Sequence, residues 1–595
     1  MRHYFLIFGF LIVCSTFIYG QDNKLIYSKQ VSNRVEKSNA ILQKNETYTS
    51  VEFVEINLEK ILEYEQFTLQ FKERNISIRK ERIDVRGINN YCFVGNNSDG
   101  SNVLISVLDD DIQGVIETPK GVFTIKTIGK REYAIITVDH SKLREACGNL
   151  HEDNSHSSFN NEDSHNHDSN IENDDTTISP ILKSAAAYDC KIRVLVLYTP
   201  NARSSVSNIK NTTLTAIALT NQSFINSQIN YQVELVYVGQ TNYTESGSYS
   251  TDLHRFIVAG DGYMDEVNAL RDKYSADICV LLAYIPSICG VASGIGASST
   301  NAFCLVSTNS TCATSNYSFG HEIGHLLGCR HDPYMDNTTT PFAYGHGYIN
   351  PSNTWRTIMA YVNACGSCPR LQYWSNPNIT YGGVPMGTVA THNNTRVWNE
   401  RSNTVMAFRQ PDNNLTLTSN DMPNTQYADA IAKQDITTSG TVNVSSGNTL
   451  NMRAGSNITL QPGFSVELGA EFSATIENIY DCSASPTPAP KIMVQKYDNT
   501  LDLQIENEPN FSHTVYPNPA NEFINITYSL DTEMSLSIEL VNLFGKKIKT
   551  VLPKQNQQAG TFTLQISVSD FSTGTYFLTI SSNNQTKTKK IIINK

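Results

Sequence analysis

The chain has 595 residues and a formal net charge of −12 at pH 7. This length predicts several domains, because a single hydrophobic core rarely serves more than roughly 250–300 residues. Nucleic acids and anionic membranes require a basic face on their partners, so the acidic balance excludes both as expected partners.

The first twenty residues have the pattern of a secretory signal peptide. Arg2 and His3 precede an apolar stretch over residues 4–13, and cleavage is expected after Gly20, which assigns residues 1–20 to the signal. No later segment is apolar over the length of a membrane span, so no integral membrane segment is expected. The sequence therefore predicts an exported protein.

The sequence HEIGHLLGCRHD, which begins at His321, predicts a catalytic zinc site. His321 and His325 are four residues apart, so on a helix both imidazoles project from one face toward one ion. Glu322 can then reach a zinc-bound water. Gly328 is expected to end the helix, because glycine tolerates the left-handed conformation, and the turned chain returns His331 as a third ligand. Three imidazoles leave one tetrahedral position open for water, which is typical of catalytic rather than structural zinc.

This motif resembles the extended zinc signature of the metzincin metallopeptidases. Asp332 is similar to the reprolysin (adamalysin-like) branch and its bacterial relatives, and Met359 lies in a TIMAY sequence that resembles the Met-turn. Residues 373–377 and 381–385 resemble the following segment of bacterial reprolysin-like enzymes, including peptidyl-Asp metalloendopeptidases. The resemblance covers roughly residues 190–410. It implies a two-lobed α/β (α+β) catalytic domain with the substrate cleft between the lobes.

The resemblance also implies one catalytic zinc ion and protein or peptide substrates. Glu322 would take the proton of the zinc-bound water and pass it to the leaving amine. Asp332 is expected to fix the chain around His331, and Met359 to pack beneath the site without binding zinc. Tyr361 either contacts the metal or the oxyanion, as in the astacin and serralysin branches, or packs beneath the site. Calcium is a second candidate ion in this clan, although no calcium loop is recognisable.

Two arginines are candidates for meeting an acidic substrate side chain. In this clan the region of residues 373–377 and 381–385 walls the pocket for the residue just after the cut, and Arg370 and Arg396 are the arginines that could meet an acidic side chain there. The alternative for each is a salt bridge on the protein surface.

Twelve cysteines in an exported chain predict disulfides. Eight of them lie within residues 184–410, where Cys365 and Cys368 directly follow the Met-turn. We expect these two to bond to other parts of the domain, since no second CxxC sequence supports a redox or zinc-ribbon motif. Cys147 has two interpretations. Its thiolate occupies the open zinc position of a latent enzyme, similar to a cysteine switch, or it forms a disulfide with Cys92.

Two segments precede the catalytic domain. Residues 21–149 alternate polar and apolar residues in short runs, which predicts a β-rich domain, and their position resembles that of an inhibitory propeptide. Residues 150–183 are rich in Asn, Asp, Glu, Ser and His. They predict a disordered acidic, histidine-rich linker in which activating proteolysis occurs.

Residues 184–410, the predicted metzincin zinc peptidase domain, alternate strands with helices. We expect strands over 192–198, 231–238 and 278–284, two short strands near 291–297 and 302–307, and helices over 204–229, 265–274 and 392–409. This order predicts a largely parallel sheet flanked by helices. One short strand is expected at an exposed edge, where an extended peptide can pair.

Three segments follow the catalytic domain. Residues 411–484 comprise a linker and a small β-rich module, in which glycines recurring every eight residues predict a β-coil or β-sandwich over 442–476. Residues 485–512 are a linker. Residues 513–595 resemble, through YPNPA, VNLFGKK and GTY sequences, the C-terminal sorting domain of the type IX (Por) secretion system. A β-sandwich fold is expected for the C-terminal modules, and the alternative to the sorting function is a plain accessory domain of that fold.

The resemblance of this last domain implies the type IX secretion machinery as a partner. The expected location is extracellular or on the cell surface of a Gram-negative bacterium of the Bacteroidetes type, and the expected state is a monomer. The sequence as a whole predicts a secreted zinc endopeptidase made as a zymogen. The competing function is a secreted adhesin or binding protein with a vestigial protease domain. The complete set of three histidines and Glu322 favours the enzyme, because decayed sites usually lose one of these residues.

Overall fold

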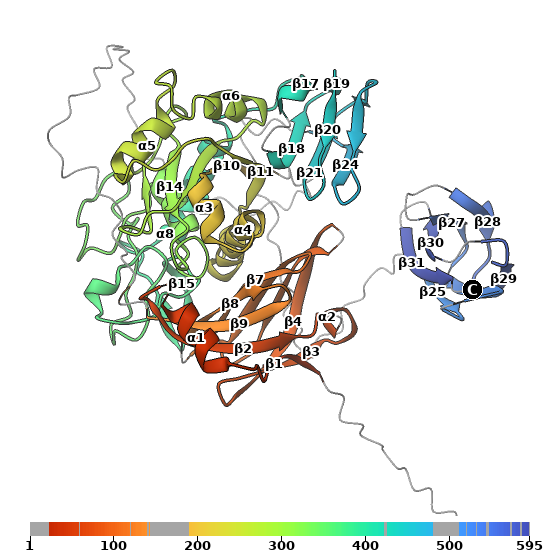
Figure 1. Ribbon diagram of the computed structural model, residues 1–595, viewed down its shortest axis with the longest axis horizontal. Coiled ribbons are helices and arrows are strands. Elements are labelled where there is room, and N and C mark those ends of the chain that lie inside the picture. Colours follow the sequence, from red (N-terminus) through yellow and green to blue (C-terminus); the bar gives the residue numbers. More distant parts are fainter. Residues whose placement is uncertain are drawn as a thin grey trace, which may run out of the picture. The chain divides into compact units, whose positions relative to one another are not determined.

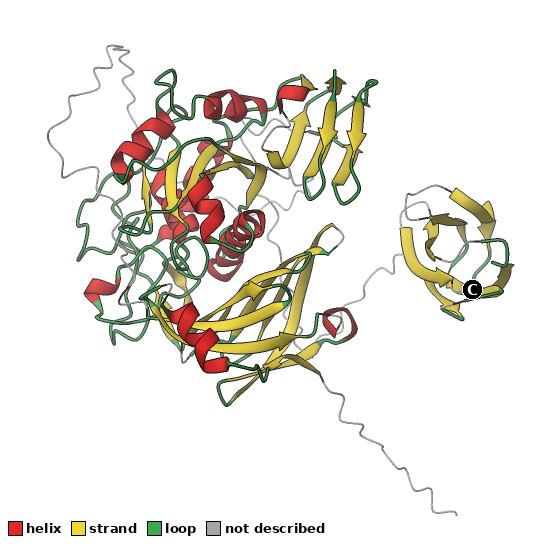
Figure 2. Cartoon of the chain, viewed as in Figure 1, coloured by secondary structure: helices red, strands yellow, loops and turns green. Residues whose placement is uncertain are grey.

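The computed structural model describes residues 23–139, 142, 190–421, 425–479 and 511–593, apart from short gaps at 44, 59, 88, 120, 519, 531, 543–546, 572–573 and 583–585. The chain divides into two compact units, Met1–Ile492 and Met493–Lys595. Among the described residues, none of the helices has the length and apolar character needed to cross a bilayer. Most of the helices lie around the central sheet of the first unit, and the two helices that precede residue 64 lie beside the N-terminal strands (Figure 2).

A closed barrel forms the N-terminal part of the first unit, drawn from red to orange in Figure 1. Its elements are β1 Lys24–Ser28, α1 Arg34–Leu42, β2 Tyr48–Ile56, α2 Lys60–Glu63, β3 Gln66–Phe71, β4 Arg74–Gly87, β5 Asn90–Asn96, β6 Asn102–Leu108, β7 Asp111–Thr118, β8 Gly121–Gly129 and β9 Glu132–Val138. Parallel pairing of β1 with β3 closes the otherwise antiparallel barrel. Apolar side chains such as Phe67, Phe93 and Ile105 fill it. This barrel agrees with the β-rich pattern predicted for the segment.

The central sheet carries five strands in the order β13-β14-β12-β10-β11. They are β10 Ile192–Tyr198, β11 Val233–Gln240, β12 Ile278–Ala283, β13 Gly290–Ala292 and β14 Phe303–Ser307. Four of them run parallel, and β13 pairs antiparallel with β14 at the edge. The predicted parallel sheet with a short strand at its edge is confirmed, but all three residues of β13 are buried, so the predicted exposure of that edge is wrong. All five strands are largely buried, and this burial explains why their sequences are almost continuously apolar.

Helices and short hairpins surround this sheet. They are α3 Pro200–Ser205, α4 Ile209–Ser227, α5 Tyr249–Ile257, α6 Glu266–Lys273, α7 Ser318–Leu327, η2 Val362–Ala364, β15 Asn376–Tyr381, β16 Val384–Met386 and α8 Asn394–Met406. The single helix predicted over 204–229 is wrong at its start, because Asn208 caps a new helix by accepting from Asn211 N at 3.1 Å. Helix α5 was not predicted, since Leu253 and Phe256 are its only buried apolar residues.

The strands after the catalytic segment form a parallel β-coil. They are β17 Asn414–Thr418, β18 Thr425–Ala432, β19 Asp435–Ser439, β20 Val442–Val444, β21 Thr449–Ala454, β22 Asn457–Thr459, β23 Phe464–Val466 and β24 Glu471–Ile476, with a short helix η3 Ser419–Asp421. Tyr427, Thr449 and Glu471 stack in register, 22 residues apart. Of the two predicted forms, the structure shows the β-coil, with a repeat of 22 residues in which each turn contains more than one strand.

This coil is also not a separate module over 442–476. Its first long strand, β18, pairs antiparallel with β11, so β18, β21 and β24 extend the central sheet to eight strands. Lys210 of α4 adds a side-chain connection by donating to Gly447 O at 3.0 Å and to Thr449 Oγ1 at 2.8 Å. The coil is thus part of the same folded body as the catalytic sheet.

The second unit contains two antiparallel sheets, β25-β26-β29 and β28-β27-β30-β31. Its strands are β25 Phe511–Tyr516, β26 Phe523–Leu530, β27 Met534–Asn542, β28 Lys547–Gln557, β29 Gly560–Ser567, β30 Gly574–Ser582 and β31 Thr586–Ile593. Alternate residues of both sheets share one apolar core, including Ile526, Leu540 and Ile580. This is the β-sandwich arrangement predicted for the C-terminal segment.

The disulfides correct two expectations. Cys289 bonds to Cys312, and Cys365 bonds to Cys368 and not to a distant part of the domain. The turn after η2 brings the two Cα atoms of the CxxC pair to 5.8 Å, which suits a direct disulfide. Cys92 is a buried free thiol, so it forms no disulfide with Cys147. Cys147 itself lies outside the described residues.

The two disulfides should differ in their contribution to stability. Cys289–Cys312 spans 23 residues and Cys365–Cys368 spans 3. Because loop closure in the unfolded chain becomes more costly with length, we expect Cys289→Ser to lower the free energy of unfolding by about 3 kcal/mol and Cys365→Ser by less than about 2 kcal/mol. Chemical denaturation of the two variants measures the difference. Equal losses would contradict the loop-length explanation.

Candidate metal centre

The zinc-type motif forms helix α7, whose ten residues are all buried. The helix ends at Gly328, which has φ of +112° and donates from its N–H to the carbonyls of Gly324 and His325. Only a glycine takes this conformation without strain. The chain then reverses, and Arg330 N donates to Gly345 O at 2.7 Å. This reversal returns His331 to the face of α7 that carries the other two histidines.

The three imidazoles converge on one point. His331 Nε2 lies 3.2 Å from His321 Nε2 and 3.0 Å from His325 Nε2. Zinc–nitrogen bonds of about 2.0–2.1 Å at tetrahedral angles separate the nitrogens by roughly 3.3 Å, so the spacing suits one zinc ion. Within the described part of the chain, these histidines are the only group of three such side chains close enough to share an ion.

Backbone carbonyls fix the orientation of two of these rings. His321 Nδ1 lies 3.0 Å from Ile358 O, and His325 Nδ1 lies 2.8 Å from Cys329 O. Each Nδ1–H therefore donates to a carbonyl and leaves Nε2 as the ligand atom. Burial lowers the pKa of all three imidazoles, that of His325 to about 4. They are therefore neutral at pH 7, which is the form that binds a metal.

The predicted supporting residues lie around the histidines. Asp332 Oδ2 accepts from Tyr361 N at 2.9 Å, so it joins the segment of His331 to the Met-turn. The Tyr361 ring packs 4.4 Å from the His331 ring, measured between centroids. Met359 is fully buried, and a Cβ built on Gly324 would lie 3.2 Å from its sulfur. Met359 thus packs directly against the zinc helix.

Glu322 is buried beside the histidines, and its position depends on a glycine that the sequence analysis did not single out. A Cβ built on Gly290 of edge strand β13 would lie 2.5 Å from Glu322 Oε1. The carboxylate therefore occupies the space that a side chain at 290 would fill. Gly290 follows Cys289 in a short apolar run, and nothing in that local sequence marks it as functional.

The two predicted arginines have different surroundings. Arg396 is on the surface, where it pairs with Glu400 at 2.6 Å and stacks over Tyr344, so the salt-bridge alternative is confirmed for it. Arg370 is buried, and the surface alternative is wrong for it. A second buried arginine, Arg356, lies next to it and was missed, because no motif distinguishes it from a surface residue.

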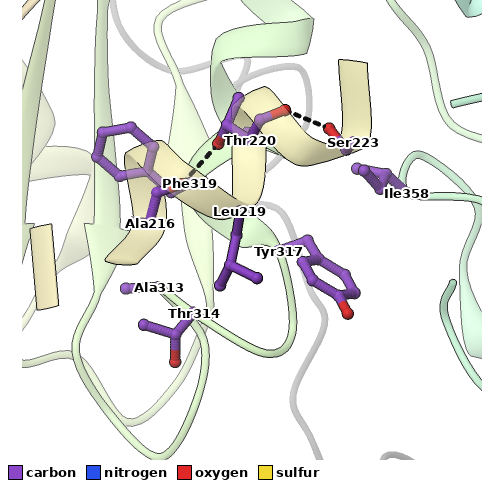
Figure 3. A pocket seen from close by; sticks show the side chains of 10 residues that line it. Ala216, Leu219, Thr220, Ser223, Ala313, Thr314, Tyr317, Phe319 and Ile358 are labelled. Atoms are coloured by element: carbon purple, nitrogen blue, oxygen red, sulfur yellow. Dashed lines mark hydrogen bonds between the residues drawn. The ribbon is translucent and has the colours of Figure 1, made fainter. Parts of the chain in front are cut away.

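Helix α4 packs against α7 through small side chains. Thr220 and Ser223 turn their hydroxyls to carbonyls of their own helix, at 2.8 and 2.6 Å (Figure 3). A Cβ built on Gly320 would lie 3.1 Å from Thr220 Oγ1, so the helices are close enough to require glycine there. The remaining space between the helices is too small for a water molecule. The zinc helix therefore has a rigid base.

Comparison with known proteins shows the family of this chain. Residues 188–375 match metallopeptidase family M12. Over 319 residues the chain is 38% identical to the peptidyl-Asp metalloendopeptidase of Stenotrophomonas maltophilia, covering 53% of this chain and 72% of that protein. The chain belongs to metallopeptidase family M12. A peptidyl-Asp metalloendopeptidase of Pseudomonas fragi is 40% identical over 190 residues, which cover 32% of this chain and 99% of that protein.

Membership of the M12 family and the relatives named peptidyl-Asp metalloendopeptidase give the enzyme class as a zinc metalloendopeptidase. Residues 514–594 match the secretion system C-terminal sorting domain, which indicates type IX secretion. Among solved structures, metalloproteinase-II from Bacteroides fragilis is similar with a TM-score of 0.28 and 14% identity, covering 45% of this chain and 81% of that one. That similarity is too low to support any statement about the present fold.

Gly290→Ala tests the placement of Glu322. The three atoms nearest to the new Cβ all belong to Glu322, so the substitution would displace the carboxylate, and we expect at least a tenfold lower kcat/KM (about 1.4 kcal/mol) with zinc content unchanged. Gly294→Ala is the matched control, because nothing lies within 4 Å of a Cβ there. Wild-type kinetics in Gly290→Ala would show that Glu322 does not need this space.

Proposed function

We propose that this M12 metalloendopeptidase uses Glu322 as its general base and cleaves peptide bonds next to aspartate. The convergence of three neutral imidazoles with Glu322 at their side is the observation that carries the mechanism. The preference for aspartate rests on the relatives, which are named peptidyl-Asp metalloendopeptidases.

His321, His325 and His331 would hold the zinc ion, which supplies Lewis acidity and lowers the pKa of its bound water. The protein's own residues contribute to the reaction by positioning the ligands and the general base. Carbonyl oxygens hold His321 and His325 in the ligand tautomer. Glu322 Oε1 sits over edge strand β13, where it can take a proton from an attacking water and return it to the leaving amine.

The variant Glu322→Ala removes the proposed general base and leaves the three metal ligands in place. We expect the zinc content to stay at the wild-type level while kcat/KM falls by roughly 10²–10⁴, because only the proton-accepting group is lost. The assay uses the zinc-loaded full chain after limited proteolysis, with a peptide library and mass spectrometry to locate cut sites. Glu400→Ala serves as a surface control. Hydrolysis at the wild-type rate by Glu322→Ala would refute the mechanism.

The proposal includes synthesis as a zymogen, with the N-terminal barrel as the propeptide. Barrel residues Leu104 and Val115 share one apolar cluster with Leu214 of α4 and with the zinc helix. Polar contacts surround this cluster, such as Asn211 Nδ2 donating to Asp111 Oδ2 at 2.7 Å. The barrel is therefore docked on the helix that supports α7. Cys147, the proposed switch, lies outside the described residues and stays a prediction.

One barrel carboxyl reaches the catalytic domain next to the zinc helix. Glu117 Oε1 accepts from the hydroxyl of Tyr317, the residue before α7, and from Gln372 N at 3.0 Å. Burial raises the pKa of Glu117 to about 7, against the opposing effect of these hydrogen bonds. Docking of the barrel is therefore coupled to protonation of this group.

Barrel docking should weaken as the pH rises. The docked pKa is above the solution value of about 4.3, so the contribution of Glu117 is complete below that pH and is lost as the pH rises to about 7. After cleavage of the linker, we expect the barrel to dissociate from the catalytic part at least roughly tenfold more readily at pH 8 than at pH 5. Size-exclusion chromatography at both pH values measures this.

Glu117→Gln is the control for this pH dependence, because its amide keeps the shape of the carboxyl and does not titrate. Its docking should change little between the two pH values. A wild-type complex that is equally stable at pH 5 and pH 8 would contradict the coupling.

A further inference from the structure

The last strand of the β-coil contacts the N-terminal barrel at the turn between β4 and β5. Glu471 of β24 lies against Gly87, where β4 ends, because a Cβ built on Gly87 would lie 2.8 Å from Glu471 Cδ. Asn90 Nδ2, at the start of β5, donates to Glu471 Oε2 at 3.5 Å. Thr449 of β21 donates to the same oxygen from the coil side, at 2.9 Å. The carboxylate of Glu471 is therefore shared between the barrel and the coil.

Four charged groups lie around this contact. Arg86 and Asp109 belong to the barrel, Lys210 to α4 and Glu471 to the coil. Burial lowers the pKa of Arg86 and of Lys210, and the negative charge of Glu471 opposes this effect at both. The barrel and the body on which it docks thus each contribute one positive and one negative group. Such complementary charges favour one orientation of docking.

An apolar contact accompanies the polar one. Tyr427 precedes Glu471 by two positions in the 22-residue register of the coil. It packs against the apolar cluster to which Cys92 of β5 belongs, and its charge is among those that act on the pKa of Arg86. The first and the third turns of the coil therefore both lie at the barrel.

This contact is separate from the docking of the barrel beside the zinc helix. There, Glu117 of the barrel accepts from the hydroxyl of Tyr317, and Asp111 accepts from Asn211 of α4. A change at Glu471 leaves all of these partners in place. The coil contact can therefore be weakened on its own.

We infer that the β-coil is a second binding site for the barrel and retains the barrel on the enzyme after the linker is cleaved. The inference rests on the proposed function, because it takes the barrel to be the propeptide. Backbone pairing of β18 with β11 keeps the coil in place while the linker is cut. A retained barrel keeps the enzyme latent, so the coil sets the delay between linker cleavage and activity.

Two polar atoms at the contact favour eventual release of the barrel. Arg86 Nε and Asn90 Oδ1 are buried and have no hydrogen-bond partner among the residues that the structure describes. Both atoms would regain water when the barrel leaves, so docking includes the cost of their desolvation. The coil contact therefore slows dissociation of the barrel without making its attachment permanent.

The test follows release of the barrel from the full chain after proteolysis of the linker. Size-exclusion chromatography measures release at pH 8, where Glu117 contributes least, and peptide hydrolysis is followed in parallel. We expect Glu471→Gln to speed dissociation at least roughly fivefold. Glu471→Lys should speed it at least roughly 30-fold, because it places a like charge near Arg86. Release at the wild-type rate in both variants would overturn the inference.

Glu467→Gln is the matched control on the coil. Glu467 accepts from Asn443 Nδ2 at 2.6 Å and from Ser446 N at 3.0 Å, and both partners belong to the coil itself. The barrel should leave this variant at the wild-type rate. An acceleration equal to that of Glu471→Gln would overturn the inference, since the loss of any coil carboxylate would then have the same effect.

Gly87→Ala tests the same contact from the barrel side. Its Cβ would overlap the carboxylate of Glu471, so release should be at least roughly fivefold faster. Gly129→Ala is its control, because the nearest atoms to a Cβ there belong to Glu132 of the barrel itself. If circular dichroism shows that the Glu471 variants do not fold, Gly87→Ala decides the question, and wild-type release in that variant overturns the inference.

Release of the barrel and catalysis are measured separately, so their failures can be told apart. If the Glu471 variants release the barrel faster but the released enzyme cleaves no peptide, retention is supported and the proposed mechanism fails. If hydrolysis begins at linker cleavage while the barrel is still bound, the barrel is not inhibitory and the inferred delay is overturned. If the wild-type chain releases its barrel as fast as Glu471→Lys, the inference fails while the mechanism stands.

Discussion

The metal centre depends on two hydrogen bonds from imidazole to backbone. His321 donates to Ile358 O and His325 to Cys329 O. These bonds set which ring nitrogen faces the ion, and they tie the zinc helix to the Met-turn and to the chain beyond Gly328. The residues around the histidines stabilise this arrangement. Gly328 allows the reversal, Asp332 holds the turn, and α4 provides the base on which the helix rests.

The two β modules of the first unit attach to the catalytic domain by different interactions. The barrel contacts α4 through side chains and an apolar cluster, so it is a docked body with its own closed sheet. The coil instead continues the central sheet through backbone pairing of β18 with β11. Side-chain docking can be reversed without unfolding either partner, whereas backbone pairing cannot be undone without opening the sheet. This difference is consistent with the proposed role of the barrel as a removable propeptide and with a coil that stays attached.

The parts of the site that could be predicted from the sequence are those whose geometry is determined by local spacing. The four-residue interval of His321 and His325 and the terminating Gly328 bring the ligands together whatever surrounds them. Prediction was wrong where distant packing decides. Arg370 is buried because the Met-turn folds over it, Cys365 meets Cys368 because η2 turns the chain, and Gly290 is needed because Glu322 reaches across to another strand. None of these contacts can be recognised from the residues that are adjacent to them in the sequence.

The 22-residue register of the coil determines the steps in which the length of the coil can change. Each added or deleted turn would change the length of the coil by one strand spacing, about 4.8 Å. Such a change would occur at the β24 edge, which is the end of the sheet farthest in strand order from β13 and the metal centre. Such a change would leave the pairing of β18 with β11 in place, because that pairing is at the other end of the coil.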